Sequence, residues 1–347
     1  MEELTSHEAY TIAVLGDIFI DVTAGGLPRS PSFGDDVGVD SVAVCTGGSA
    51  LNTAIQLQSL GGSRIAVEFH GALGDDGWAE MIRARAAKAG VTLRATVVEG
   101  SATGVCIVLS GCGDRGFVSA YAANRAWKVS DIDIAALFAV EHIHVGGFFS
   151  ISKEVRVALP ALLRTAREDH GCTVSFDTNF DGTGQWADVA AMLPNVDAFL
   201  PNDTELRLIA AALGDAPPDG DLEASIDVLL QHTSFVVVTC GADGVVARQS
   251  AKTGGAAWKV GAKVAAAVVD ATGCGDAFNA GLLNCWLTGG VSGDGVPMTE
   301  AAGLDFSDAA VEAALIEGCA VGTVVISRMG ACIDAVTAED VRAVLRT

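Results

Sequence analysis

Short apolar runs alternate along most of the chain with longer segments whose apolar residues recur at helical spacing. Residues 11–16 and 235–239 are typical of buried strands, and residues 50–60 and 78–89 are typical of helices that stop at glycines. The same alternation predicts further strands at 65–69, 142–145, 173–176, 198–200 and 264–269, and further helices at 187–193 and 277–287. This order predicts an α/β fold in which helices flank a mostly parallel sheet.

Two stretches near the start of the chain break this alternation. Residues 17–44 are rich in Gly, Pro and Asp and carry alternating valines, and residues 103–121 read as two short strands around a glycine-rich turn. They predict a small β-sheet that stands apart from the large one as a lid.

Composition and charge narrow the range of partners. The chain has 347 residues, and 43 acidic against 21 basic residues give a net charge of −22. A field of this sign repels nucleic acid and anionic membranes, so we expect neither as a partner. We also expect a cytoplasmic enzyme, because no apolar run approaches the roughly 20 residues of a membrane span and the N-terminus is acidic and polar.

The cysteines and histidines do not predict a metal centre. Nine cysteines are scattered without a C-x-x-C pair, which argues against zinc and against a disulfide framework. His142 and His144 alternate along one predicted strand, and we interpret them as structural.

Residues 270–279 form the strongest local motif, a glycine turn between a predicted strand and a helix. Gly273 and Gly275 permit a tight turn, and the free N–H groups at the start of the helix form an anion site. Asp276 falls in the first helical turn, where it either caps the helix or serves the anion site. A thiol at Cys274, at the helix N-terminus, is expected to be acidified.

Three further segments have weaker signals. Gly47-Gly48 precedes a helix that places Asn52 one turn in, where its amide offers a donor and an acceptor to hydroxyls. Asn202 and Glu205 follow a strand and either cap a helix or hold Mg²⁺ through water. Residues 239–244 form a glycine turn after the most apolar strand. The chain has no P-loop, and its glycines do not fit a dinucleotide motif or a hydrolase nucleophile elbow.

Together and in this order, these motifs resemble the ribokinase/PfkB family of carbohydrate kinases. The similarity covers residues 11–335 and includes residues 71–77, whose glycines and aspartates match the family pattern before a helix. The resemblance implies a ribokinase-like fold with a β-sheet lid, ATP and Mg²⁺. It also implies an α/β core of residues 11–17, 46–100 and 124–347, the last with the nucleotide site, and a lid of residues 18–45 and 101–123.

The resemblance also implies a role for each motif. Asp276 would be the base that accepts the hydroxyl proton, and the N–H groups of Gly273, Cys274 and Gly275 would hold the transferring phosphoryl group. The acceptor site would comprise Asp21, Gly47, Gly48 and Asn52. The ATP site would comprise Asn202, Glu205, Thr239, Gly241, Gly244 and Asn279, with Glu205 holding Mg²⁺ through water. Asp270, the Thr272 carbonyl and Gly330 match a K⁺ site found in part of the family.

The motifs leave the acceptor open. Phe19 stands where ribokinases have Asn, and Asp181 stands where Arg is frequent, which argues against ribose and against acidic sugars. A neutral sugar or a derivative, phosphorylated at a terminal CH₂OH, is the leading expectation. A nucleoside kinase and a catalytically silent binding protein are the alternatives. Arg115, in the predicted lid, either meets a phosphate or is a solvated turn residue. The protein is a monomer or a homodimer through the lid.

Overall fold

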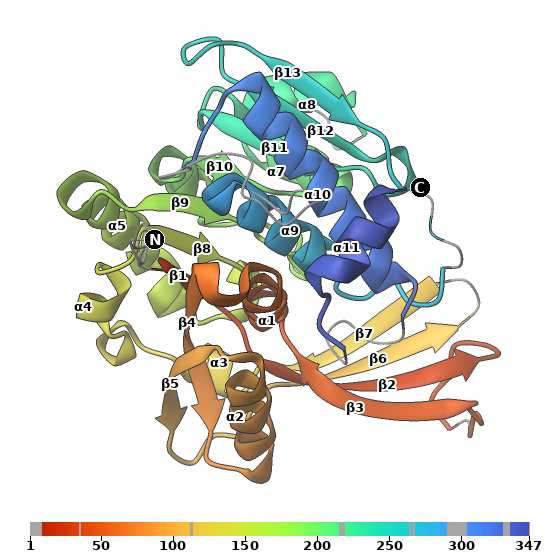
Figure 1. Ribbon diagram of the computed structural model, residues 1–347. Coiled ribbons are helices and arrows are strands. Elements are labelled where there is room, and N and C mark those ends of the chain that lie inside the picture. Colours follow the sequence, from red (N-terminus) through yellow and green to blue (C-terminus); the bar gives the residue numbers. More distant parts are fainter. Residues whose placement is uncertain are drawn as a thin grey trace, which may run out of the picture.

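The computed structural model describes residues 9–34, 36–111, 114–214, 219–263, 265, 268–289, 304–328 and 334–346. Within these residues, nine strands form a large sheet in the order β13-β12-β11-β10-β9-β8-β1-β4-β5 (Figure 1). They are β1 (Tyr10–Leu15), β4 (Ile65–Gly74), β5 (Thr92–Val98), β8 (His142–Val145), β9 (Thr173–Phe176), β10 (Ala198–Phe199), β11 (Phe235–Thr239), β12 (Val245–Gln249) and β13 (Ala257–Val260). All neighbours pair in parallel except β11–β12 and β12–β13, so the prediction of a mostly parallel sheet is confirmed.

Helices cover both faces of the large sheet. On one face the apolar cores contain residues of α1 (Ser49–Gly61), α2 (Gly77–Ala89), α9 (Cys274–Thr288), α10 (Asp308–Ile326) and α11 (Ala338–Leu345). On the other face the core contains residues of α3 (Ala123–Ala126), α4 (Ile134–Leu137), α5 (Lys153–His170), α6 (Val189–Met192), α7 (Asp203–Ala212) and α8 (Leu222–Leu229). Successive residues of β1 point alternately into the two cores, which is why its sequence is apolar throughout.

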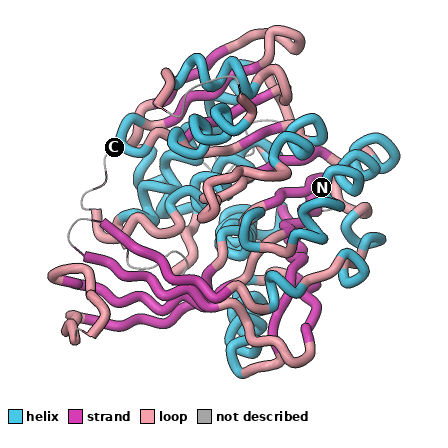
Figure 2. The backbone as a smooth tube through the Cα atoms, turned by 180° about the vertical axis from the view of Figure 1, so that it is seen from behind, coloured by secondary structure: helices cyan, strands magenta, loops and turns pink. Residues whose placement is uncertain are grey.

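Four strands form the separate small sheet, in the order β3-β2-β6-β7. They are β2 (Phe19–Leu27), β3 (Ser41–Gly47), β6 (Val105–Gly111) and β7 (Asp114–Ala120). They extend away from the helices at one side of the molecule, as the view from behind shows (Figure 2). The small sheet predicted from residues 17–44 and 103–121 is therefore present.

The side chains of the small sheet alternate between two unlike faces. Asp21 and Val108 are buried on the face turned toward the large domain. Val44, Ile107 and Val118 lie in one row across the opposite face and are exposed by 43%, 41% and 59%. The outer face of the small sheet is thus apolar and open.

The aspartates of residues 71–77 join the large domain to the small sheet. Asp76 begins α2 and accepts hydrogen bonds from the N–H of Thr103, at 2.8 Å, and from the Thr103 hydroxyl, at 2.7 Å. Gly74 lies so close that a Cβ would be 2.2 Å from the Thr103 nitrogen. This motif holds the segment from which β6 enters the small sheet.

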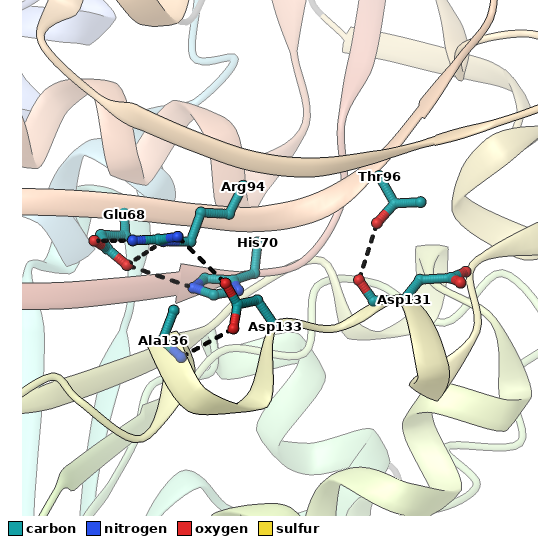
Figure 3. A network of polar contacts seen from close by, with 7 residues as sticks. All are labelled: Glu68, His70, Arg94, Thr96, Asp131, Asp133 and Ala136. Atoms are coloured by element: carbon teal, nitrogen blue, oxygen red, sulfur yellow. Dashed lines mark hydrogen bonds and ion pairs between the residues drawn. The ribbon is translucent and has the colours of Figure 1, made fainter.

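A charged network fixes β5, the edge strand at the other end of the sheet (Figure 3). The Arg94 guanidinium donates to both oxygens of Glu68 on β4, at 2.5 and 2.9 Å, and to Asp133 at 3.3 Å. Asp133 caps α4 through the N–H of Ala136. Burial lowers the pKa of the neighbouring His70 to about 4, so that this histidine is neutral at physiological pH.

Two sequence predictions are corrected here. Residues 264–269 do not form a strand at the positions that the structure describes, and the edge strand of the sheet is instead β13. Contrary to expectation, one helix of the described chain, α10, is long and apolar enough to cross a membrane. Its apolar window is 56% buried in the molecule, against α9 and the sheet, which is typical of a core helix.

His142 and His144 lie on β8 inside the core. Both rings share the hydroxyl of Ser175, with His142 Nε2 at 2.9 Å and His144 Nδ1 at 2.8 Å. Burial lowers the pKa of each ring to about 3. No cluster of metal-ligating side chains is found among the described residues, and these two rings have hydroxyl partners in the core.

Candidate active site

The candidate site lies where the parallel strands of the large sheet end. Asp17 follows β1, Asp177 follows β9, Asn202 follows β10 and Thr239 ends β11. Parallel strands present their carboxyl ends at the same edge of a sheet, which is where ligands bind in open α/β folds. The first turns of α1 and α9 reach this edge from the helical layer.

Asp276 is buried in the first turn of α9 and is held by α1. The Ser49 hydroxyl donates to Oδ1 of Asp276 at 2.7 Å, and the Asn52 amide donates to Oδ2 at 2.8 Å. Burial raises the pKa of Asp276 to about 7; these two hydrogen bonds lower it, and the negative charges of Asp177 and Asp17 raise it further. The sequence prediction brought Asp276 and Asn52 to one site and missed Ser49.

The start of α9 has the geometry of an anion site. Gly273, the residue before the helix, has φ of 72°, which favours glycine. Apart from the adjoining backbone of α9 itself, no atom lies within 4 Å of the place where a Cβ on Gly275 would stand, so this side of the turn is open. The N–H of Cys274 makes a 3.3 Å bond to the carbonyl of Ala271, a long contact for which an anion would compete. The first N–H groups of a helix have no partner within it.

The prediction of an acidified thiol at Cys274 is wrong. Burial raises the pKa of Cys274, and the nearby charge of Asp276 raises it further. The Sγ atom turns away toward the carbonyl of Gly322, at 3.7 Å. Desolvation and the charge of Asp276 outweigh the positive charge of Arg115, which lowers this pKa.

Gly47 and Gly48 are crowded by acidic residues of the β1–β2 segment. A Cβ on Gly47 would lie 2.2 Å from the Asp21 carboxylate, and one on Gly48 would lie 2.7 Å from the Asp17 carbonyl. Burial raises the pKa of Asp21 to about 7, and the charges of Asp17 and Asp276 add to this. Gly47 therefore allows Asp21 to sit beside the first turn of α1, and Gly48 allows the close approach of the Asp17 backbone.

Asp17, which the sequence analysis did not single out, caps α1 from a distance. The residue at the N-cap, Gly48, has no side chain, and the N–H of Ala50 donates instead to Oδ1 of Asp17 at 3.1 Å. Burial raises the pKa of Asp17, whereas the backbone hydrogen bonds of Ala50 and Ser49 lower it. This contact sets the position of the turn that carries Ser49.

A second set of buried polar groups follows β9 and β10. The Asn279 amide donates to Oδ2 of Asp177 at 2.6 Å. Asn202 and Glu205 form a reciprocal capping box at the start of α7, with bonds of 2.9 and 3.1 Å. Burial raises the pKa of Asp177 and that of Glu205, and the charge of Glu205 adds to the rise at Asp177. The capping alternative for Asn202 and Glu205 is thus confirmed.

The segments predicted to line a nucleotide pocket lie side by side. Asn202 and Thr239 form a parallel bridge, and the N–H of Thr239 donates to the carbonyl of Pro201 at 3.2 Å. Gly241 and Gly244 have φ of 55° and 91°, and a Cβ on Gly244 would lie 2.1 Å from a carbonyl of β13. Asn279 is turned to Asp177 rather than to this turn.

Arg115 reaches from β7 of the small sheet to the turn before α9. Its guanidinium donates to the Thr272 hydroxyl at 2.7 Å and lies 3.4 Å from Oδ1 of Asp270. Arg115 is therefore not a solvated turn residue. Gly330, the third residue expected at a K⁺ site with Asp270 and the Thr272 carbonyl, lies outside the described residues.

An open α/β sheet with a separate small sheet, and a helix N-terminus beside a buried carboxylate, agree with the ribokinase-like class of phosphotransferases. The sequence profile of the pfkB family carbohydrate kinases matches residues 10–338. The chain belongs to this family, and it is a phosphotransferase that uses an alcohol group as acceptor.

Individual relatives agree with the family. The chain is 26% identical to an adenosine kinase of Schizophyllum commune over 65% of this chain and 68% of the relative. It is 27% identical to a fructokinase of Klebsiella pneumoniae over 82% of this chain and 86% of the relative. The structure of Arabidopsis thaliana ribokinase complexed with ribose and ATP superposes with a TM-score of 0.76, at 21% identity and over 98% of this chain and 99% of that one.

Proposed function

We propose that the protein transfers the γ-phosphoryl group of ATP to a terminal CH₂OH of a neutral sugar or sugar derivative, with Asp276 as the base. The observation that carries the proposal is the buried Asp276 carboxylate, held by two donors beside the open start of α9. A base is most effective when its pKa is near the working pH, and the pKa of Asp276 is raised to about 7.

The transferring phosphoryl group would lie at the start of α9. The N–H groups of Gly273, Cys274 and Gly275 would meet its oxygens, and the helix dipole favours negative charge there. Donors fixed on a helix need no reorganisation as charge develops, and phosphoryl transfer depends mainly on such positioning. Closure of the small sheet over the site would exclude water and suppress idle ATP hydrolysis.

Nucleotide and metal would bind on the side of Asn202, Thr239, Gly241 and Gly244. Mg²⁺ keeps several waters and is held by one or two carboxylates together with substrate phosphates. Glu205, a buried carboxylate close enough to Asp177 for their charges to interact, fits this chemistry through water. When bound, the ion would neutralise phosphate charge. The use of K⁺ at Asp270, the Thr272 carbonyl and Gly330 stays a prediction.

The acceptor would lie between the first turn of α1 and the inner face of the small sheet. Asp21, Gly47, Gly48 and Asn52 would meet its hydroxyls. Asp21, Asp17 and Asp276 are negatively charged when ionised, which favours a neutral, hydroxyl-rich acceptor over an anionic one.

A nucleoside acceptor is the second candidate. Phe19 and Tyr121 form an edge-to-face pair, with ring centroids 6.0 Å apart, at the root of the small sheet, where apolar rings would flank a base. The similarity to an adenosine kinase supports the same reading. A silent binding protein is disfavoured, because Asp276 and the open turn before it are both intact.

The proposed partners are a small-molecule acceptor and, through the outer face of the small sheet, a second copy of the chain. The exposed row of Val44, Ile107 and Val118 supports the homodimer over the monomer. Light scattering of the wild type and of Ile107→Glu tests this, because a dimer through this face should dissociate in the variant. The cytoplasmic location stays a prediction.

The proposed function is tested by ³¹P NMR of the products formed from ATP and Mg²⁺ with a panel of neutral sugars and nucleosides. A phosphomonoester formed from a sugar alone supports the first proposal, and one formed from nucleosides alone supports the second. Tight ATP binding without any phosphorylated product would contradict both.

A further inference from the structure

The Ser49 hydroxyl contacts the group on which the proposed transfer depends. Ser49 lies in the first turn of α1, and its Oγ donates to Oδ1 of Asp276 at 2.7 Å, while Asn52 occupies Oδ2. Ser49 and Asp276 are each only 8% exposed, so the bond is made away from solvent. A carboxylate oxygen can accept two hydrogen bonds, and Oδ1 therefore still has room for the hydroxyl of an acceptor.

The surroundings of Asp276 are strongly acidic. Four other carboxylates interact with Asp276 through their negative charges. The charges of Asp17, after β1, and Asp177, after β9, raise the pKa of Asp276. The charge of Asp276 in turn raises the pKa of Asp21, on β2, and of Glu205, on α7. The charge of Asp276 also raises the pKa of the Cys274 thiol in the same turn. Burial and these charges raise the pKa of Asp276, whereas the hydrogen bonds that Ser49 and Asn52 donate lower it.

We propose that Ser49 is a positioning residue for phosphoryl transfer: its hydroxyl, fixed at the start of α1, orients the Asp276 carboxylate and supports it as the proton acceptor. The hydroxyl can do this because Asp17 caps the same turn through the N–H of Ala50, at 3.1 Å. This inference rests on the proposed role of Asp276 as the base and adds a residue of α1 to it.

The chain supplies a matched control one turn further along α1. The Thr53 hydroxyl also donates to residue 276, but to its backbone carbonyl, at 3.3 Å, and Thr53 is fully buried. Thr53→Val removes a hydroxyl of the same helix with little change in shape and leaves the Asp276 carboxylate as it was. If the role of Ser49 were purely structural, Ser49→Ala and Thr53→Val would have the same effect on kcat and on its dependence on pH.

The kinetic test compares Ser49→Ala, Ser49→Thr and Thr53→Val with the wild type, using the acceptor found in the panel. We expect Ser49→Ala to lower kcat about ten- to a hundredfold, the range for loss of a hydrogen bond to a charged group, with little change in the KM for ATP. Its acid limb of kcat against pH should move up by about one pH unit, because a donor to the carboxylate is lost. Ser49→Thr should recover much of kcat, and Thr53→Val should keep the wild-type kcat and acid limb. Wild-type kcat and acid limb in Ser49→Ala, or the same losses in Thr53→Val, would overturn the proposal.

A second measurement does not depend on turnover. Urea unfolding at pH 8 of the wild type, Ser49→Ala, Asp276→Asn and the double variant forms a double-mutant cycle. We expect the loss of unfolding midpoint caused by Ser49→Ala to be at least halved in the Asp276→Asn background. Additive losses would overturn the Ser49 proposal whatever the activity. A coupled cycle in a protein that phosphorylates no acceptor would refute the proposed function and leave the Ser49–Asp276 contact standing.

Discussion

The turns before α1 and α9 look alike in the sequence but differ in what surrounds them. At the α1 turn, a Cβ on Gly47 would collide with Asp21, and Gly48 lies against the backbone of Asp17. At the α9 turn, the space beside Gly275 is open. Glycine serves the packing of protein groups at the first turn, whereas at the second it leaves open space. In the proposed mechanism the first turn belongs to the acceptor side of the site and the second to the phosphoryl side.

The acidic residues beside these two turns, Asp21 and Asp276, should affect different kinetic constants. Asp276→Asn should lower kcat by about 10²–10⁴-fold, the usual contribution of a positioned base, while the fold is kept. Asp21→Asn should instead raise the acceptor KM about tenfold or more, because it weakens a charged hydrogen bond to a hydroxyl. Steady-state kinetics checks both, and a loss of kcat in Asp21→Asn with full kcat in Asp276→Asn would reverse the assignment.

Replacing a glycine by alanine at each turn should affect stability at one turn and kcat at the other. Gly275→Ala should leave the unfolding midpoint close to wild type, because the new Cβ would meet no atom within 4 Å beyond the adjoining backbone of α9. The same Cβ should lower kcat about tenfold or more by filling the anion site. Gly47→Ala should destabilise the fold by about 1–3 kcal/mol, because its Cβ meets the Asp21 carboxylate. Thermal unfolding and kcat, measured on both variants, check the pair. Equal destabilisation of the two proteins would contradict the difference between the turns.

The sequence carried the main parts of this site but not the contacts that assemble it. Glycine turns and helix starts are local patterns, which is why the sequence alone indicated Gly47, Gly48, Asn52 and Asp276. The bond between Ser49 and Asp276 spans 227 positions in the chain, and only the packing of α1 on α9 creates it. Asp17 was missed for the same reason, since a helix capped by the end of another strand has no local cap to recognise.

The fold was predictable where the periodicity was long and unambiguous. The parallel order of the large sheet follows from alternating strands and helices, and the small sheet follows from the two segments that break this rhythm. Residues 264–269 are as apolar as a strand, yet the edge position is taken by β13, where Trp258 packs on Phe235. Apolar content alone does not decide which of two short segments pairs with the sheet.

Burial of Asp276 also predicts a stability effect that depends on pH. Its pKa of about 7 in the folded protein exceeds the value of about 3.9 in an unfolded chain, so the folded state binds the extra proton between these values. The contribution of this group to stability therefore falls as the pH rises through 7. Asp276→Asn, which carries no charge, should be more stable than wild type by about 1–3 kcal/mol at pH 8, a range discounted from the size of this shift.

Urea unfolding at pH 8 and pH 5 checks this prediction. The difference between Asp276→Asn and wild type should narrow toward pH 5, where the wild-type carboxyl is itself protonated. Asp40→Asn, at an exposed position near the start of β3, serves as the matched surface variant. A difference that is constant across this range would mean that Asp276 does not titrate as described.

Of the variants described here, Arg115→Ala should have the smallest effect on the reaction. Its contact with Thr272 ties the small sheet to the turn before α9, and the guanidinium is partly exposed, which limits the energy of the ion pair with Asp270. Arg115→Ala should raise ATP hydrolysis without acceptor about two- to fivefold, because the site closes less well against water. ADP release without acceptor measures this, and Arg83→Ala, on α2 of the large domain, is the control. Equal hydrolysis in wild type and Arg115→Ala would show that this contact does not govern closure.

The central claim is that Asp276 accepts the proton of the acceptor hydroxyl, and that the neighbouring anion site binds ATP without the help of this carboxylate. It is tested most directly by measuring two quantities on wild type and Asp276→Asn: ATP binding by calorimetry, and acceptor-dependent ADP release with the best substrate of the panel. The account predicts ATP affinities within about threefold of each other and a loss of at least about a hundredfold in ADP release for the variant. Unchanged acceptor-dependent ADP release in Asp276→Asn would contradict it.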